Sequence, residues 1–513
     1  MSGLTLQDAP VLVVGAGIMG VGIAQVAAQA GHAVQLFDMR EGAAAAAKAR
    51  LAGTFDGLVN KGRLDGTAAQ AALSRIEPIG TLAQAARAAL VVEAIVEDLA
   101  AKRALFQQLE TLLGARAVLA TNTSSISVTA IANGLQRPER LVGMHFFNPV
   151  PLMKLVEVVS GLRTDSAVAQ AILELAGTWG KTAVHAKSTP GFIVNRIARP
   201  YYAEALALLQ ERAATPEALD AALRGAGFRM GPCELMDLIG HDTNFAVTNS
   251  VFDANFQDKR YQPSVVQREM VDGGLLGRKS GQGFFVYPEG APPLPGPPPK
   301  LTTAPGQVTV HGSGAIADAL AHAVAQTAAR HAPKHTCVLA RLRDSDWVGL
   351  EIDGARLAVT DGRSAAELAA TLRRRDVAVI DRPFVLPPAP GTALAFAVAD
   401  EAWRDRAAAW LAELGFTPVH VADTPGLVAA RTVAMLINEA ADAVQQGVCN
   451  EAGADAAMKL GVNYPAGPFE FLANWSVPEV VALLDKLDHL YRGERYRVSP
   501  LLRRRALQRQ SPA

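Results

Sequence analysis

The chain has 513 residues, more than one hydrophobic core accommodates, so we expect roughly three or four domains. Its 49 lysines and arginines balance 49 aspartates and glutamates, which gives no electrostatic reason to expect a nucleic acid or an anionic membrane as a partner. The three cysteines, Cys233, Cys337 and Cys449, are isolated and form neither a disulfide framework nor a zinc motif, which favours a reducing compartment and no metal.

An apolar run at residues 10–31 is too regular in its glycines, and too poor in preceding basic residues, for an export signal. No later stretch is a convincing membrane span. We therefore expect a soluble, cytoplasmic protein without a membrane partner.

The first motif predicts a dinucleotide-binding turn. A β-branched run, Val11 to Val14, leads into the glycine turn 15–20, a helical segment follows, and a second strand at residues 34–37 ends on Asp38. Its glycines permit a tight turn and let backbone N–H groups approach a pyrophosphate at the helix N-terminus. The candidate cofactor contacts in the turn are Gly15, Gly17, Ile18, Met19 and Gly20.

Asp38 indicates which dinucleotide is bound. Its carboxylate would accept hydrogen bonds from the adenosine ribose hydroxyls and repel a 2′-phosphate, so the sequence favours NAD over NADP. The alternative is an ordinary turn between a strand and a helix.

Residues 41–80 are rich in alanine and predict helices, with a basic cluster at Lys61-Gly62-Arg63. Such a cluster is usually a solvated face, and the less favoured alternative is contact with an anionic substrate tail. Residues 89–97 predict another strand, and Lys102 lies on the helix after it.

The run Thr121-Asn122-Thr123-Ser124-Ser125 follows a further predicted strand, residues 117–120. Its polar side chains either cap the next helix or face a ligand at the carboxyl edge of the sheet, and the two roles are compatible.

Residues 143–159 place His145 and Glu157 on apolar segments separated by a turn around Pro149 and Pro151. Proline lacks a backbone donor and fixes φ, so we expect the chain to double back there. An imidazole oriented by a carboxylate across that bend would move a proton near neutral pH. The alternative is an unrelated surface histidine and glutamate.

A helical domain is predicted from about residue 189 to 275. It begins after the break Thr189-Pro190-Gly191, continues as a helix over residues 192–209 that carries Asn195 near its start, and is closed by residues 277–285. An asparagine in a first helical turn is usually a cap or exposed, so Asn195 alone indicates little.

Beyond a proline-rich linker at residues 291–300 the helical domain recurs. Thr424-Pro425-Gly426 aligns with Thr189-Pro190-Gly191, Arg431, Glu439 and Asp455 align with Arg196, Glu204 and Asp220, and Gly467-Pro468 and Glu470 match Gly231-Pro232 and Glu234 after a one-residue insertion. In this copy Ala430 replaces Asn195, and no histidine-to-glutamate segment precedes it.

Residues 307–422 predict a degenerate α/β unit. A strand at 307–310 leads into His311-Gly312-Ser313-Gly314-Ala315, which keeps two glycines of a dinucleotide turn, and residues 378–380 predict another strand. No acidic ribose partner follows a clear second strand, so we do not expect a second cofactor site there.

These residues resemble the L-3-hydroxyacyl-CoA dehydrogenase family. The matching segments are V-G-A-G-I-M-G, V-V-E-A-I-V-E, T-N-T-S-S-I, G-M-H-F-F-N-P-V-P-L-M-K-L-V-E-V-V, T-P-G-F-I-V-N-R and G-R-K-S-G-Q-G-F-F, in this order over residues 10–287. The full length resembles the long bacterial form with a duplicated C-terminal region, found in phenylacetate degradation and poly-3-hydroxybutyrate metabolism.

The resemblance implies that the chain oxidises an L-3-hydroxyacyl-CoA with NAD. It implies that His145 is the catalytic base, that Glu157 orients it, and that Ser124 and Asn195 contact the substrate oxygen or position the ring. The cofactor would also contact Glu97, Lys102, Ser124, Asn148 and Lys279, and Lys61 would meet coenzyme A. The acyl chain, 3-hydroxyadipyl or 3-hydroxybutyryl, is not readable from the residues.

The implied architecture is a Rossmann-type NAD-binding domain (residues 1–187) followed by an all-α domain like that of 6-phosphogluconate dehydrogenase (188–290). A linker (291–306), the degenerate α/β unit (307–422) and the second helical copy (423–513) complete it. Short family members form homodimers through the helical domain, so we expect a homodimer, or a copy that packs on the first as a pseudo-dimer. Alternatives are another β-hydroxyacid dehydrogenase, or a non-catalytic nucleotide-binding protein of this fold.

Overall fold

The computed structural model describes residues 4–294, 296, 301, 305–331, 337–389 and 391–510. It contains two compact units, Met1–Arg196 with Ala443–Val462, and Ile197–Asp442 with Asn463–Ala513. Of the expected linker, residues 295, 297–300 and 302–304 lie outside the described residues. Within the described ranges, no helix combines the length and the apolar character needed to cross a bilayer.

The first unit is built on an eight-stranded sheet with the order β3-β2-β1-β4-β5-β6-β7-β8. The pairs are parallel except β6 and β7, which are antiparallel. The strands are β1 (Val11–Val14), β2 (Val34–Phe37), β3 (Ile76–Pro78), β4 (Leu90–Glu93), β5 (Val118–Thr121), β6 (Leu141–Phe146), β7 (Leu155–Ser160) and β8 (Thr182–Lys187). The central strands are buried along their whole length, as expected of parallel strands covered by helices on both faces.

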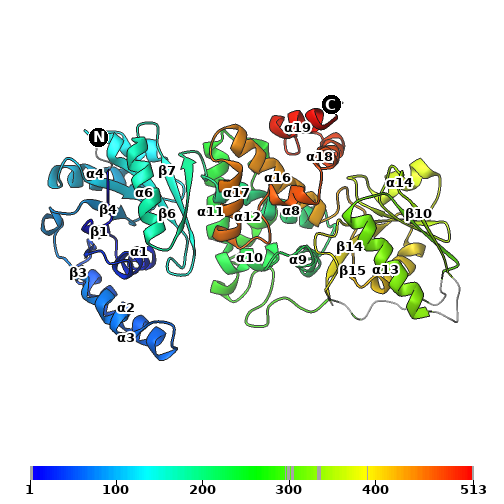
Figure 1. Ribbon diagram of the computed structural model, residues 1–513, viewed down its shortest axis with the longest axis horizontal. Coiled ribbons are helices and arrows are strands. Elements are labelled where there is room, and N and C mark those ends of the chain that lie inside the picture. Colours follow the sequence, from blue (N-terminus) through cyan, green and yellow to red (C-terminus); the bar gives the residue numbers. More distant parts are fainter. Residues whose placement is uncertain are drawn as a thin grey trace. The chain divides into compact units, whose positions relative to one another are not determined.

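Helices complete this unit, which has the predicted Rossmann-type architecture (Figure 1). They are α1 (Ile18–Gln29), α2 (Ala43–Asn60), α3 (Gly66–Ser74), α4 (Leu99–Leu112), α5 (Val128–Ala132), α6 (Ser166–Thr178), α7 (Val194–Ile197) and α17 (Glu451–Val462). Although α17 belongs to the second helical copy by sequence, it packs on β7 and β8. A side chain at Gly461 of α17 would meet Leu155 at 2.7 Å, so the glycine permits this close packing.

The second unit contains the remaining part of the helical repeat. Its helices are α8 (Arg199–Gln210), α9 (Pro216–Gly225), α10 (Pro232–Ile239), α11 (His241–Ala254), α12 (Val265–Asp272), α16 (Ala429–Gln445, up to residue 442), α18 (Val477–Tyr491) and α19 (Pro500–Gln510). The single helix predicted over residues 192–209 is instead two helices, α7 and α8. Pro200 explains the break, because it lacks an N–H and its ring clashes with the carbonyl four residues earlier.

The same unit holds a second sheet of seven strands with the order β10-β9-β11-β12-β13-β14-β15. These are β9 (Gln307–His311), β10 (Val338–Leu342), β11 (Gly349–Ile352), β12 (Ala355–Val359), β13 (Val377–Ile380), β14 (Ala393–Val398) and β15 (Thr417–His420), with helices α13 (Ala315–His331), α14 (Ala365–Leu372) and α15 (Arg404–Glu413). Three of its pairs are parallel (β10/β9, β12/β13 and β14/β15) and three are antiparallel (β9/β11, β11/β12 and β13/β14). The predicted degenerate α/β unit is therefore a mixed sheet.

The helical duplication is visible in the backbone. Gly191 and Phe192 have φ of 75° and 47°, and Gly426 and Leu427, at the aligned positions, have φ of 71° and 50°. Left-handed φ is uncommon for phenylalanine and leucine, so its presence in both copies shows that the turn itself was duplicated.

The two copies exchange ion pairs inside the second unit. Glu204 of α8 accepts hydrogen bonds from Arg431 of α16 (2.7 Å), Arg495 (2.9 Å) and Tyr496 (3.0 Å). In return, Glu439 of α16 accepts bonds from Tyr261 at 2.6 Å and Arg260 at 3.4 Å. The expected packing of the copy on the first domain is thus present between α8 and α16. The sequence repeats the Arg-Tyr pair, at 260–261 and 495–496.

Candidate functional site

The glycine turn after β1 forms as predicted and depends on two of its glycines. Gly15 has φ of 108°, and a Cβ there would lie 2.4 Å from the Ala94 oxygen. A Cβ at Gly20 would lie 1.8 Å from the Gly15 oxygen. Gly17 faces open space, and no side chain caps α1. The first N–H groups of α1 are therefore available to an anion such as a pyrophosphate.

Asp38 lies beside this turn at the end of β2. Its carboxylate accepts hydrogen bonds from the Ala16 N–H (2.8 Å) and from the N–H and Nε of Arg40 (both 3.0 Å). The bond from the Arg40 side chain lowers the pKa of Asp38 to about 2, so the carboxylate is ionised at neutral pH. Turn and carboxylate together fit an NAD-type dinucleotide. Ile18, 78% exposed, and Met19 lie at the same turn.

Lys102 is buried among carboxylates. Its Nζ lies 2.6 Å from Glu93 Oε1 and 3.4 Å from Glu97 Oε2. The other oxygen of Glu93 accepts a bond from the Thr121 hydroxyl at 2.7 Å. Lys102 thus ties the ends of β4 and β5 to Glu97, whose side chain is 37% exposed.

Glu97 organises the polar run after β5. Its Oε1 accepts bonds from the Thr123 hydroxyl (2.7 Å) and from the N–H groups of Ser124 (2.9 Å) and Ser125 (3.0 Å). Burial opposes the charge of Glu97, but these bonds and the charge of Lys102 outweigh it and lower its pKa. An ionised Glu97 therefore fixes the position of Ser124 at the carboxyl edge of the sheet.

His145 and Glu157 meet across the bend, as predicted. They are register partners on the antiparallel strands β6 and β7, and His145 Nδ1 lies 2.6 Å from Glu157 Oε2. The two side chains are 6% and 0% exposed. An ionised carboxylate only accepts, so Nδ1 carries the proton and Nε2 keeps the lone pair of a base.

The second oxygen of Glu157 binds the start of α7. Oε1 accepts bonds from the Ile193 N–H (3.0 Å) and the Val194 N–H (2.9 Å), and Asn195 comes next in the chain. The Asn195 amide lies 3.5 Å from the Ser124 carbonyl oxygen. One carboxylate thus sets both His145 and the helix turn that carries Asn195, and the four predicted polar residues come together.

Further contacts that sequence reasoning missed hold the same region. The His145 ring packs against Phe147 and Phe192, with centroids 4.6 and 5.8 Å apart. The Asn122 side chain accepts a bond from the Phe146 N–H at 2.9 Å. Lys181, 8% exposed, donates to the carbonyls of Val150 (2.5 Å) and Met153 (2.8 Å), and so ties down the turn between β6 and β7. A lysine that starts an edge strand carries no sequence signal for this role.

Three further predicted residues are Asn148, Lys61 and Lys279. Asn148 is exposed on the turn after β6, and Lys61 is exposed at the end of α2. Lys279 belongs to the second unit and pairs with Asp242. Their contacts with cofactor or coenzyme A stay predictions.

Family models match most of the chain, with residues 288–356 outside the matches. The NAD-binding domain of 3-hydroxyacyl-CoA dehydrogenase matches residues 10–189, and its C-terminal domain matches both 191–287 and 426–511. The second match confirms the predicted duplication. The reduced Rossmann-fold domain of 3-hydroxybutyryl-CoA dehydrogenase matches residues 357–425.

Known proteins agree with these matches. The 3-hydroxyadipyl-CoA dehydrogenase of Escherichia coli is 45% identical over 97% of both chains. A probable 3-hydroxybutyryl-CoA dehydrogenase of Bacillus subtilis is 42% identical over 54% of this chain and 97% of its own length. The crystal structure of an E. coli 3-hydroxybutyryl-CoA dehydrogenase superposes with a TM-score of 0.86 at 42% identity and covers 98% of each chain.

Proposed function

Because the chain belongs to the 3-hydroxyacyl-CoA dehydrogenase family, we propose that it oxidises an L-3-hydroxyacyl-CoA to the 3-oxoacyl-CoA with His145 as general base and Glu157 as its orienting partner. The 2.6 Å contact between His145 Nδ1 and Glu157 carries this proposal, because it leaves Nε2 as the basic nitrogen.

The proton and the hydride leave the substrate by different routes. His145 Nε2 takes the proton of the 3-hydroxyl group, the C3–O bond becomes a carbonyl, and the buried Glu157 carboxylate stabilises the imidazolium that forms. NAD, when bound, supplies the hydride acceptor for C3. A positioned base is typically worth ~100- to 10,000-fold in rate.

The neighbouring polar groups would hold the reactants. Ser124 and Asn195 would contact the substrate oxygen, and the Asn195 amide lies 3.5 Å from the backbone carbonyl of Ser124. Asp38 would accept from the adenosine ribose, and the open end of α1 would meet the pyrophosphate. Glu97 fixes Ser124, and Lys102 holds Glu97 ionised, so both act on the site through Ser124.

A His145→Ala variant tests the role of the base. It should bind NADH normally and lose ~100-fold or more of its acetoacetyl-CoA reduction, measured as NADH oxidation. The matched control is His185→Ala, which removes an exposed histidine bonded to Ser160 and should keep wild-type turnover. Near-normal turnover in His145→Ala would contradict the base, and an inactive wild-type chain would favour a non-catalytic nucleotide-binding protein.

For the acyl tail we propose 3-hydroxyadipyl-CoA over 3-hydroxybutyryl-CoA. The support is the 45% identity to a 3-hydroxyadipyl-CoA dehydrogenase over 97% of both chains. A comparison of kcat/KM for the two substrates tests the choice, and a higher value for 3-hydroxybutyryl-CoA would reverse it.

A homodimer and a cytoplasmic location stay predictions. A dimer of this chain would need a face other than the one α8 presents to α16, because Arg431 and Glu204 already pair within the chain. Sedimentation velocity of the purified chain measures the assembly directly.

A further inference from the structure

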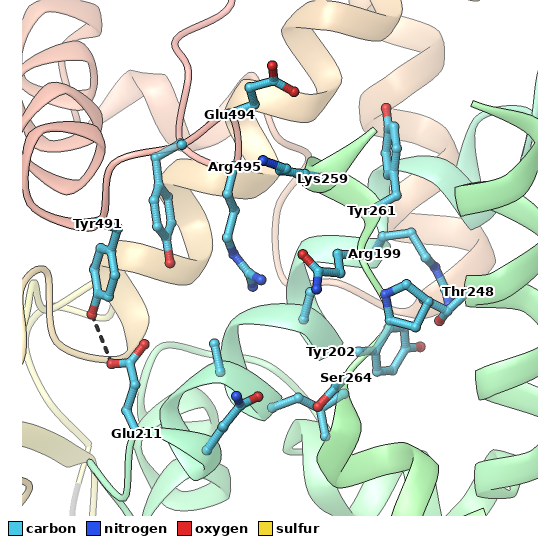
Figure 2. A pocket seen from close by; sticks show the side chains of 18 of the residues that line it. Arg199, Tyr202, Glu211, Thr248, Lys259, Tyr261, Ser264, Tyr491, Glu494 and Arg495 are labelled. Carbon is cyan, nitrogen blue, oxygen red and sulfur yellow. Dashed lines mark hydrogen bonds between the residues drawn. The ribbon is translucent and has the colours of Figure 1, made fainter. Parts of the chain in front are cut away.

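A pocket of about 470 Å³ lies within the second unit, and none of its lining residues is assigned above to catalysis or cofactor binding. It is bounded by α8, by the segment that precedes α12 and by the turn after α18. Figure 2 shows Arg495 extending into the pocket, with Glu211 and Tyr491 on one side and Arg199 with Thr248 on the other. Both helical copies therefore contribute side chains to it.

The side chains around this pocket carry an excess of positive charge. Its cationic lining residues are Arg199, Lys259, Arg431, Arg492 and Arg495, and its carboxylates are Glu211 and Glu494. A further carboxylate, Glu204, lies behind the lining and accepts bonds from Arg431 and Arg495. Even when Glu204 is included, cations outnumber carboxylates, and a partly enclosed cavity strengthens their attraction for an anion.

Arg199 is, with Arg431, one of the two buried cations of this lining. It is 5% exposed, its guanidinium donates to the Thr248 hydroxyl at 3.0 Å and stacks 4.9 Å from the Tyr202 ring centre. Burial lowers its pKa, which means that the structure tolerates this charge at a cost.

The duplicated helix shows that the helical framework does not need this arginine. The register that aligns Arg196 with Arg431 and Glu204 with Glu439 places Ala434 opposite Arg199 and Ile437 opposite Tyr202. Ala434 and Ile437 are fully buried, so the corresponding positions of the copy are part of an apolar core. The repeated Arg-Tyr pair, at 260–261 and 495–496, places Glu494 opposite Lys259, so neither Arg199 nor Lys259 has a cationic counterpart in the copy.

We propose that this pocket binds a small organic anion through carboxylate or phosphate groups, with Arg199 at its base and Lys259 at its mouth. Lys259 is exposed, and the hydroxyl and amide groups of Thr248, Ser264 and Gln267 add polar contacts around the lining. Its volume of about 470 Å³ lies within the range of small-molecule sites, which run from roughly 300 to 1,000 Å³.

Isothermal titration calorimetry on the full chain tests the proposal. NADH is kept saturating, so that a nucleotide probe does not report the cofactor site, and ionic strength is held constant with chloride. The probes are inorganic phosphate, AMP and citrate, which separate a bare phosphate, a nucleotide and a polycarboxylate. At least one should bind with a Kd below ~1 mM.

Charge-reversal variants show where the anion binds. Lys259→Glu places at the mouth the residue type that the copy has at Glu494, so it should fold normally, and it should weaken binding ~10-fold or more. Arg199→Lys, which keeps the charge but loses the planar group, should weaken it less. The matched control, Arg375→Glu, reverses an exposed charge outside the pocket and should bind like wild type. Equal affinity in Lys259→Glu and Arg375→Glu, or the absence of any probe that binds with a Kd below ~1 mM, would overturn the proposal.

Discussion

The two halves of the chain use a carboxylate in the same way at the start of corresponding helices, but only in the first half does that carboxylate also contact a histidine. In the first, Glu157 accepts the N–H groups of Ile193 and Val194. In the second, Asp381, directly after β13, accepts those of Val428 and Ala429 at 3.0 and 2.6 Å. The residues that donate these N–H groups lie at aligned positions of the repeat, Ile193 with Val428 and Val194 with Ala429.

The difference between the halves separates two roles of Glu157. Asp381 also accepts from the Ala430 N–H at 2.9 Å, so all of its contacts with the duplicated turn are to backbone. Glu157 instead gives one oxygen to His145, and Asn195 stands where the copy has Ala430. Both carboxylates therefore fix a helix start, and the bond to His145 is the one that the proposed catalytic role of Glu157 adds.

The largest effect is expected from Glu157→Gln. The amide oxygen can still accept the N–H groups of α7, but a neutral group stabilises the imidazolium poorly, so kcat should fall ~100- to 10,000-fold. NADH affinity and Tm should change little. Steady-state kinetics with acetoacetyl-CoA, NADH titration and a thermal melt measure the three quantities. A large loss of Tm with unchanged kcat would show that Glu157 acts only as Asp381 does.

A large loss of stability is expected when the ion pairs between the halves are broken. Glu204→Ala removes the buried carboxylate that Arg431 and Arg495 share and leaves Arg431 only the partly exposed Glu211, so it should cost ~3–5 kcal/mol in free energy of unfolding. Glu439→Ala, at the reciprocal position, should act in the same direction. Urea denaturation measures both against Glu269→Ala, an exposed position that should stay within ~0.5 kcal/mol of wild type. A Glu204→Ala chain as stable as that control would mean that the exchange is incidental.

A smaller and pH-dependent effect is expected from Asp381→Asn. The amide can offer only one oxygen to the N–H groups that now bond two, so the variant should lose about 1–3 kcal/mol of stability while keeping its turnover.

The sign of the pH dependence follows from the raised pKa. Burial raises the pKa of Asp381 from 3.8 to about 6, so the folded state holds this proton more tightly than the unfolded state. The stabilisation of the folded state that comes from this raised pKa is therefore complete below about pH 3.8 and is lost as pH rises through about 6. The stability gap between wild type and Asp381→Asn should therefore be widest near pH 4 and narrower at pH 7, by chemical denaturation. A gap that widens with pH would contradict this.

The sequence predicts more of the site in the first half than of the corresponding region in the second half. Short-range chemistry was readable: the glycine turn, Asp38, the proline turn that brings His145 to Glu157, and Asn195 at a helix start. Asp381 was not, because a lone aspartate after an apolar strand has no partner until the chain has folded. The Arg260–Glu439 pair joins residues far apart in the chain, and Lys181 acts through backbone carbonyls that any residue possesses.

The smallest effect concerns the two glycine turns. Gly15, Gly17 and Gly20 correspond in position to Gly312, Gly314 and Ala317, so the third glycine, where a Cβ would lie 1.8 Å from a carbonyl oxygen in the first half, is an alanine in the second. The residue after the next parallel strand changes from Asp38 to Arg343. An arginine offers no acceptor to ribose hydroxyls, so the second turn should not bind NADH.

NADH titration by fluorescence should therefore give a single saturable site per chain. Asp38→Asn should weaken it about tenfold, because a charge-assisted bond to the ribose becomes a neutral one. Arg343→Asp, the matched change in the second half, should leave the affinity unaltered. If Arg343→Asp weakened NADH as Asp38→Asn does, the second turn would be part of a working dinucleotide site, and the loss of its third glycine would not have closed it. If Arg343→Asp instead created a second NADH site, the absence of a carboxylate at position 343 would be the sole reason that the second turn does not bind NADH.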